Sequence, residues 1–216
     1  MTAPILPEGR SSATASMAVL ISGSGTTLVN LARQVAAGTL PVTIVGVISS
    51  RSGVAGLDRA RELGLPVKIV ERKAYPDTGR FSDQLTAALD TWRPDIICMA
   101  GFLSLWQIPS HYAGRVLNIH PALLPRFGGR GMHGAKVHEA VIAAGETQSG
   151  CTVHLADNQY DHGPVILQRT CPVLPGDTPQ SLAARVFAEE CLAYPEAIRR
   201  FLSGHASRPD TGRRFG

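Results

Sequence analysis

The sequence lacks the features that mark membrane, secreted and nucleic-acid-binding proteins. No apolar run approaches the roughly 20 residues needed to span a bilayer, and Met1 to Ser16 contain no continuous apolar segment of the secretory type. The formal net charge is only +4, and three arginines and one aspartate place +2 of it in His205 to Gly216. Because the sequence has no dense basic stripe, no nucleic-acid partner is expected. Because it shows neither a membrane span nor a secretory segment, the sequence predicts a cytoplasmic protein.

Aromatic residues and paired cysteines are also scarce. Aromatics make up 6% of the 216 residues, so a core built from the 44% hydrophobic residues has to rely on aliphatic packing. None of the four cysteines belongs to a Cys-x-x-Cys pair, and each lies beside apolar residues. We interpret them as buried reduced thiols, with disulfide, metal-ligand and nucleophile roles as alternatives.

Short apolar runs alternate with amphipathic stretches in the first part of the chain. The strand-like runs are residues 17–21, 42–48, 66–70, 95–100 and 116–120, and helical stretches begin at Leu28 and cover 56–63 and 81–92. Buried strands joined by helical crossovers predict an α/β, Rossmann-like fold: a mostly parallel twisted sheet with helices on both faces.

The second part of the chain has a different pattern. A glycine-rich loop at 126–134 precedes a helix at 135–144, and strand-like runs at 151–156 and 164–173 flank a polar turn. Two strands without an intervening helix predict an antiparallel hairpin. A long final helix is expected over 178–202, broken near Pro195. We expect a single domain at 17–203, a disordered lead at 1–16 and a flexible tail at 204–216; the oligomeric state is left open.

A glycine loop separates the first predicted strand from the first predicted helix. Residues 23–27 read Gly-Ser-Gly-Thr-Thr. Glycines allow a sharp turn, and the free amides of a helix start attract an anion such as phosphate. The loop is neither a P-loop nor a complete dinucleotide fingerprint. An ordinary strand-to-helix turn and a phosphate site are therefore both compatible with it.

Asn118 and His120 end the fifth predicted strand. Because side chains at i and i+2 share a face, the two project together at the edge where open α/β sheets bind ligands. An Asn amide can stabilise an oxyanion, and a His can move protons, as acyl transfer to an amine requires. Asp161, in the polar turn of the hairpin, is the natural carboxylate to favour the imidazolium form. Taken alone, the pair is better explained as a strand-end Asn and a packed His, and only its position at the sheet edge narrows that preference.

Four segments together resemble the phosphoribosylglycinamide formyltransferase family, within the folate-dependent formyltransferase superfamily. They read Ser22-Gly-Ser-Gly-Thr-Thr27, Ala100-Gly-Phe102, Leu117-Asn-Ile-His-Pro-Ala-Leu-Leu-Pro125 and Asp161-His-Gly-Pro-Val-Ile-Leu-Gln168. The similarity runs from about Met17 to Leu202. It implies transfer of a formyl group from 10-formyltetrahydrofolate, a co-substrate, to glycinamide ribonucleotide, with no metal.

The resemblance also implies roles for individual residues. Asn118 resembles the family's asparagine that binds the oxyanion and contacts the donor. His120 resembles its catalytic acid and base, and Asp161 resembles the aspartate that favours the charged form of that histidine. The acceptor is expected at Gly25, Thr26, Thr27 and Glu190. The folate is expected at Arg80, Leu103, Ser104, Leu105, Trp106, Ala156 and Asp157.

The chain departs from the family pattern near the folate. The family often has Met-Arg after Gly-Phe, where this chain has Leu103-Ser104, so a cation is lost. The arginine usual before the third helix corresponds to Thr78 or, one turn later, to Arg80; a solvated helix-start residue is the simpler interpretation of Arg80. These changes leave the predicted catalytic residues intact and concern how the folate tail is held.

Three further histidines and three other functions have to be weighed. His154 lies in a strand and can line the site, whereas His138 and His162 are interpreted mainly as structural. A formyltetrahydrofolate hydrolase usually carries an extra N-terminal domain and a methionyl-tRNA formyltransferase an extra C-terminal one. Neither is expected from this chain's length, and the complete set of catalytic residue types argues against a silent binding module.

Overall fold

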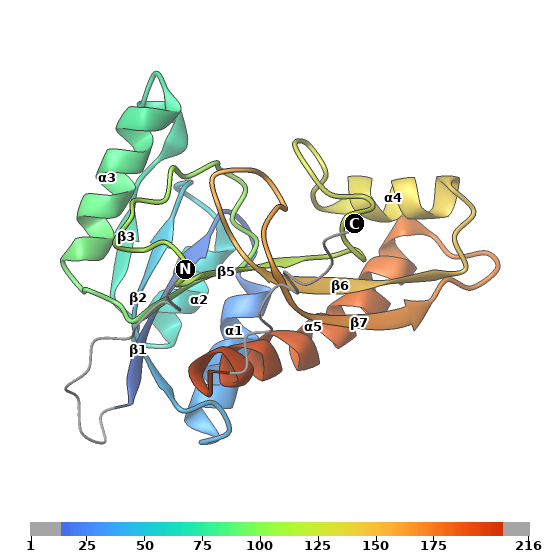
Figure 1. The fold of residues 1–216 in the computed structure, drawn as a ribbon, viewed down its shortest axis with the longest axis horizontal. Helices are drawn as coiled ribbons and strands as arrows, with labels where there is room; N and C mark the ends of the chain where they lie inside the picture. Colours follow the sequence, from blue (N-terminus) through green and yellow to red (C-terminus); the bar gives the residue numbers. More distant parts are fainter. Residues whose placement is uncertain (1–13, 205–216) are drawn as a thin grey trace, which may run out of the picture.

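Seven strands form one sheet in the order β3-β2-β1-β4-β5-β6-β7 (Figure 1). The computed structural model describes residues 14–204. The expected lead and tail therefore lie almost entirely outside the described residues, although Ala15 and Ser16 already belong to β1. The elements are β1 (Ala15–Ile21), α1 (Thr26–Ala36), β2 (Val42–Ser49), α2 (Ala55–Glu62), β3 (Val67–Ile69), a 3-10 turn (Arg72–Ala74), α3 (Thr78–Asp90), β4 (Ile96–Met99), β5 (Val116–His120), α4 (Ala135–Ala143), β6 (Gln148–Leu155), β7 (Val165–Pro172) and α5 (Pro179–Leu202).

Strand directions confirm the predicted α/β class. β1 pairs in parallel with β2 and β4, β2 with β3, and β4 with β5. β6 runs antiparallel to β5 and to β7, so the predicted C-terminal hairpin is present. Because β1 has β2 on one side and β4 on the other, the chain leaves β1 at a topological switch point, where open α/β sheets form a ligand crevice.

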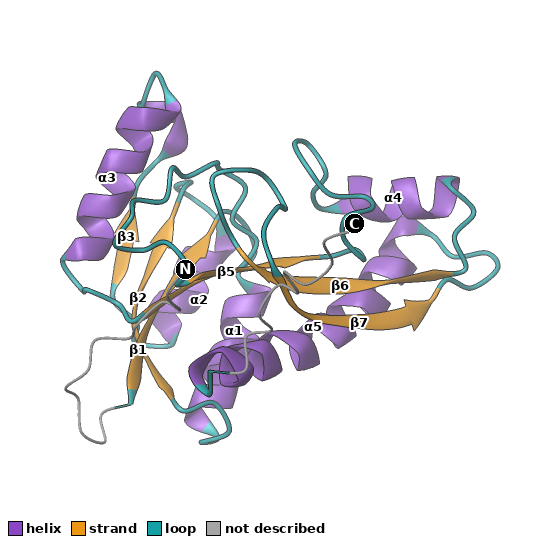
Figure 2. Cartoon of the chain, viewed as in Figure 1, coloured by secondary structure: helices purple, strands orange, loops and turns teal. Residues whose placement is uncertain are grey.

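The alternation of side chains along β1 divides the core into two layers. Met17, Val19 and Ile21 pack with residues of α1 and α5 on one face. Leu20 packs with Phe81 and other α3 residues on the opposite face. This period of two is what a strand buried on both faces requires. Helices consequently cover both sides of the sheet, and α4 packs against α5 beyond β6 (Figure 2).

The final helix differs from the prediction, because α5 continues through Pro195 without a break. Proline has no N–H, so it leaves the carbonyl four residues earlier without its helical donor. That carbonyl belongs to Cys191, and the Asn30 side chain of α1 donates to it at 3.0 Å. Tyr194 and Ile198, on either side of the proline, are fully buried. Packing and a substitute donor therefore keep the helix intact. No helix within residues 14–204 is both long and apolar enough to cross a membrane.

The Asn30 contact can be tested by a double-mutant cycle. Asn30→Ala should lower the free energy of unfolding by about 1 kcal/mol, because a helical carbonyl loses its donor. In a Pro195→Ala background the helix regains its own N–H at this position, so the same substitution should cost measurably less. Urea unfolding followed by circular dichroism measures both. If Asn30→Ala lowered the free energy of unfolding equally in both backgrounds, the Asn30 side chain would not be replacing the N–H that Pro195 lacks.

Candidate active site

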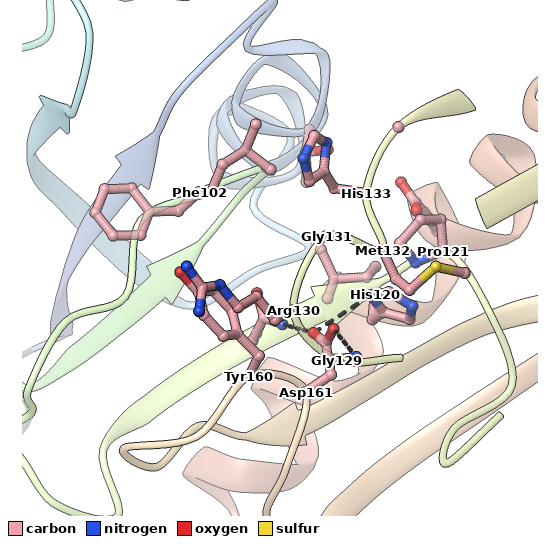
Figure 3. Close-up of a pocket in the computed structure, with 17 residues that line it drawn as sticks. Phe102, His120, Pro121, Gly129, Arg130, Gly131, Met132, His133, Tyr160 and Asp161 are labelled. Carbon is pink, nitrogen blue, oxygen red and sulfur yellow. Dashed lines mark hydrogen bonds and ion pairs between the residues drawn. The ribbon is translucent and has the colours of Figure 1, made fainter. Parts of the chain in front are cut away.

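A cleft of about 360 Å³ opens beside the carboxyl ends of β1, β4 and β5. It contains side chains from the glycine loop, the end of β5, the 121–134 loop, the 156–164 turn and α5. Its lining includes Thr27, Phe102, Leu103, Asn118, His120, Gly129, Arg130, Met132, His133, Tyr160, Asp161 and Glu190. The predicted catalytic residues are thus brought together in one hollow (Figure 3).

β5 presents Asn118 and His120 on the same side, as its alternation predicted. The residues between and before them, Ile119 and Leu117, pack into the core layer of α5. Across the antiparallel pair, Asn118 lies opposite His154, and His120 lies opposite Thr152. The two candidate side chains are therefore fixed by strand register.

His120 is almost fully buried, with 3% of its surface exposed. Its Nδ1 lies 3.3 Å from Asp161 Oδ1, and its Nε2 lies 2.8 Å from the Phe127 carbonyl oxygen. Both neighbours are acceptors, since a carbonyl and an ionised carboxylate carry no proton. The imidazolium form, with a proton on each nitrogen, satisfies both contacts, which suits a proton donor.

Asp161 joins three segments of the site. Its Oδ1 faces His120 and accepts from Asn118 Nδ2 at 3.4 Å, while its Oδ2 accepts from the Gly129 N–H at 2.9 Å. Burial by itself would raise the pKa of this carboxyl, but the hydrogen bond and charge of His120 and the Gly129 N–H together lower it below its ordinary value. Asp161 is therefore held as an anion beside the histidine.

The turn that carries Asp161 has a strained backbone and an obligatory glycine. Asp161 itself has a φ of 51°, in the left-handed region that few residues adopt. Two residues later Gly163 has a φ of 106°, and a Cβ there would lie 2.2 Å from the Leu155 carbonyl oxygen. Only glycine permits this close approach, which explains the Asp-His-Gly segment.

His154 orients the Asn118 amide. Asn118 Nδ2 donates to His154 Nε2 at 3.0 Å, and His154 Nδ1 lies 3.0 Å from the Leu155 carbonyl oxygen. The tautomer with its proton on Nδ1 satisfies both bonds, and burial lowers the pKa of His154, which favours this neutral form. One amide proton of Asn118 is thus directed to His154, and the other makes the long contact to Asp161.

The glycine loop contributes one threonine to the cleft. Thr27 lines it, whereas Thr26 is exposed and lines a separate pocket beside α5. Gly25 is the N-cap residue of α1 at a φ of 74°, and a Cβ there would lie 2.7 Å from Gly56 Cα. No side chain caps the helix start. Its first amides therefore have no side-chain cap, which is compatible with an anion site, and the sequence-based expectation of a phosphate there stays a prediction.

Glu190 of α5 lies in the same cleft in a contrasting environment. Burial raises the pKa of its carboxyl to about 7, partly opposed by the positive charge of His120. One cleft therefore contains two carboxyls whose pKa values are shifted in opposite directions, downward at Asp161 and upward at Glu190. Such opposed shifts are typical of functional sites.

The predicted folate loops border a smaller hollow next to Asn118. Ser104, Leu105, Trp106, Ala156 and Asp157 line it, and Leu103 lines the main cleft. The Trp106 indole is 1% exposed and donates to Thr86 Oγ1 at 3.1 Å, so much of its role is structural. The loops expected to meet the donor thus lie beside the predicted catalytic residues.

Arg80 is not brought to this region. Its side chain is exposed at the start of α3, 3.8 Å from Asp77, and it lines none of the clefts around Asn118. Asp77 is the N-cap of α3, and its side chain accepts from the backbone N–H of Arg80. The contacts of Arg80 are therefore with the start of its own helix. Its predicted folate contact has no support from this placement.

Sequence reasoning did not single out several residues of the cleft. Arg130, Met132 and His133 enter it from the 121–134 loop, and Tyr160 enters from the hairpin turn. The glycines of this loop are the one sequence feature that pointed to an unusual backbone there, and Gly129 and Gly131 do adopt positive φ angles. A loop without periodicity gives no indication of which side chains turn inward.

The two histidines interpreted as structural lie outside the cleft lining. His138 is buried in α4 with its Nδ1 unbonded within the described chain, and His162 pairs with Asp157. Among residues 14–204, no group of three or more His, Cys, Asp or Glu side chains is arranged to hold a metal. The expectation of metal-free chemistry stays a prediction.

Comparison with known proteins assigns the family. The formyl transferase family model matches residues 15–198. This chain belongs to the formyl transferase family. The family resemblance inferred from the four sequence segments is thereby confirmed, and the Asn-Ile-His-Pro and Asp-His-Gly-Pro segments both lie within the matched range.

Individual members of the formyl transferase family resemble the chain over most of its length. It is 35% identical to the phosphoribosylglycinamide formyltransferase of Escherichia coli, over 86% of each chain. The crystal structure of glycinamide ribonucleotide transformylase 1 from Symbiobacterium toebii is 39% identical, with a TM-score of 0.82 over 88% of this chain and 89% of that one. The trifunctional purine biosynthetic protein adenosine-3 of Drosophila pseudoobscura pseudoobscura is 40% identical over 89% of this chain, which spans 14% of that protein's length.

The buried carboxyl of Glu190 generates a pH-dependent prediction. Its folded pKa lies above the ordinary value, so between about pH 4.5 and 7 the folded state keeps a proton that the unfolded state has lost. Stability therefore falls as pH rises through this window. Glu190→Gln should raise the free energy of unfolding at pH 8 by about 1–3 kcal/mol, with little gain at pH 4.5.

The measurement is urea unfolding across that pH range. Glu196→Gln, on the same helix but outside the cleft, should keep the pH dependence of the unchanged protein. A Glu190→Gln variant whose stability declines between pH 4.5 and 7 as steeply as the parent would show that Glu190 does not cause the decline.

Proposed function

We propose that this chain transfers the formyl group of 10-formyltetrahydrofolate to the amine of 5-phosphoribosylglycinamide, yielding N-formylglycinamide ribonucleotide and tetrahydrofolate in de novo purine synthesis. The observation that carries the proposal is the contact of Asp161 with both His120 and Asn118 in a cleft that also contains Thr27 and Glu190. The relatives named as formyltransferases support the reaction class and the acceptor.

The proposed reaction is an acyl transfer between two nitrogens. The acceptor amine attacks the formyl carbon, and the carbonyl electron pair moves onto oxygen. To stabilise that oxyanion, Asn118 redirects the N–H of its long contact to Asp161, and the His120 imidazolium redirects the Nε2–H that otherwise meets the Phe127 carbonyl. His120 then transfers a proton to N10 of the folate, the carbon–N10 bond breaks, and the proton lost by the attacking amine restores the imidazolium. Asp161 stabilises the charged ring throughout.

The substrates are assigned by the chemistry of the lining. The free amides at the start of α1, with Thr27, suit the phosphate of the acceptor, and Glu190 suits its nucleotide portion. Asn118, the 103–106 segment and residues 156–157 are assigned to the folate. Both partners are small molecules, and no step uses a metal. The cytoplasmic location stays a prediction from the sequence.

A coupled spectroscopic assay tests the function. Folate deformylation should be followed by absorbance with and without 5-phosphoribosylglycinamide, and turnover should require the ribonucleotide. Deformylation at the same rate without it would instead indicate a hydrolase with the same catalytic core. Folate binding without turnover under either condition would indicate a silent binding module.

Replacement of the histidine tests its assigned role. His120→Ala should lower turnover by about two to four orders of magnitude, because the proton carrier is removed, while ribonucleotide binding persists. The matched control is His111→Ala, an exposed histidine paired with Asp90 away from the cleft, which should retain turnover. Near-normal turnover of the His120→Ala variant would remove His120 from the mechanism.

A further inference from the structure

The segment that follows β4 is held in place by side chains. Within residues 14–204, no amide of residues 102–108 donates to a backbone carbonyl. Side-chain oxygens at 2.7–2.9 Å accept from three of these amides instead: Ser22 from Leu103, Ser82 from Gln107 and Asn158 from Ile108. Because a buried amide without an acceptor is costly, these three bonds decide where the segment lies.

The three acceptors come from different parts of the fold. Ser22 follows β1 directly and Ser82 belongs to α3, and both are buried. Asn158 comes from the turn between β6 and β7, and its side chain is exposed. That turn also carries Asp161, the carboxylate that faces His120. Of the three bonds, the one from Asn158 therefore ties the segment to the turn of a predicted catalytic residue.

The Asn158 bond also joins two segments that line the hollow beside Asn118. Residues 104–106 line it from one segment, and residues 156–157 and 159–161 line it from the other (Figure 1). In the part of the chain that the structure describes, no other hydrogen bond connects residues 102–108 with residues 156–161. The width of this hollow consequently depends on a single hydrogen bond, from the Ile108 N–H to Asn158 Oδ1.

The turn that carries Asn158 is braced internally. Asp157 Oδ1 accepts from the Gln159 N–H at 2.9 Å, and Asp157 Oδ2 lies 2.5 Å from His162 Nδ1. At the base of the turn, the Leu155 N–H donates to the Pro164 carbonyl at 2.9 Å. A turn with these cross-links moves as a unit, so the position of Ile108 is coupled to the whole turn.

We propose that Asn158 is a positioning residue for the formyl donor. Its side chain holds the 102–108 segment against the hairpin turn and so sets the spacing of the hollow assigned to the folate. Asn158 lines neither the catalytic cleft nor the hollow, so it acts through the backbone of Ile108 and not by contact with the donor. This rests on the proposed function, because it assumes a folate donor.

Steady-state kinetics of Asn158→Ala test the positioning role. The KM for 10-formyltetrahydrofolate should rise about three- to tenfold, the range expected for the loss of one neutral hydrogen bond. The KM for 5-phosphoribosylglycinamide should stay the same, because Asn158 contacts neither the glycine loop nor Glu190. The value of kcat should change little, since Asp161 keeps its contacts with His120 and Gly129.

Binding of an unreactive folate analogue separates positioning from catalysis. We would titrate the full chain with 5,8-dideazafolate, without acceptor, by calorimetry. Asn158→Ala should weaken binding by the same factor of about three to ten. Asn158→Asp keeps an acceptor oxygen of the same reach and should bind within about twofold of the unchanged protein at about 0.15 M salt, which screens the added charge.

A matched control removes the same kind of bond elsewhere. Thr178 is exposed at the start of α5, and its side chain accepts from the Ser181 N–H at 3.1 Å. It lines neither the catalytic cleft nor the hollow. Thr178→Ala should lower the melting temperature about as much as Asn158→Ala does, measured by circular dichroism, while the KM for the donor stays unchanged.

Three results would overturn the positioning role. An unchanged donor KM in Asn158→Ala would show that the bond to Ile108 does not set the hollow. An equal rise in the KM values for donor and acceptor would indicate general damage. A loss of analogue binding in Asn158→Asp as large as in Asn158→Ala would show that the acceptor oxygen is not what matters.

These results are distinguishable from failure of the proposed function. Each of the three leaves that function standing if deformylation still requires the ribonucleotide. If the unchanged protein did not bind 5,8-dideazafolate, the folate donor itself would be refuted, and the positioning role with it.

Discussion

The contact between Asp161 and His120 joins parts of the chain that are far apart in the sequence. Asp161 comes from the turn of the C-terminal hairpin, His120 from the end of β5, and Gly129, which donates to the same carboxylate, from the loop after β5. The left-handed backbone at Asp161 and the contact of Gly163 with Leu155 hold the carboxylate in place. The relative placement of these three segments therefore rests on contacts to both oxygens of one partly buried carboxylate.

The sheet supplies the framework in which that contact forms. Parallel strands bring the glycine loop, the 100–106 segment and the end of β5 to one edge, and the reversal of strand order at β1 opens the crevice there. The antiparallel strand β6 then places His154 beside Asn118. Tyr194 of α5 donates to the carbonyls of Met99 and Leu117, which ties the last helix to the two strands that carry the site. Glu190 is one turn earlier on that helix.

Electrostatics divides the site into regions of different character. Asp161 keeps its charge because three donors surround it, whereas Glu190 is driven toward its neutral form by burial. Arg51 and Arg130 are both exposed, and within residues 14–204 neither forms a salt bridge with a carboxylate. Asp161, Glu190 and His120 thus line one cleft, and Arg130 lines both this cleft and the neighbouring one that contains Arg51.

The sequence by itself determined the strands, most helices and the shared face of Asn118 and His120, because these depend on local periods of two and 3.6 residues. It also identified the glycine at 163 through a family segment. It could not determine that α5 passes through Pro195, since the compensating donor, Asn30, lies 161 residues away. It left both a folate contact and a solvated helix-start position open for Arg80, and the structure shows that side chain exposed at the start of α3. Only the tertiary structure decided that Arg51, Arg72 and Arg130 share a cleft, because proximity between distant loops is set by how strands pack into a sheet and leaves no periodic trace in the sequence.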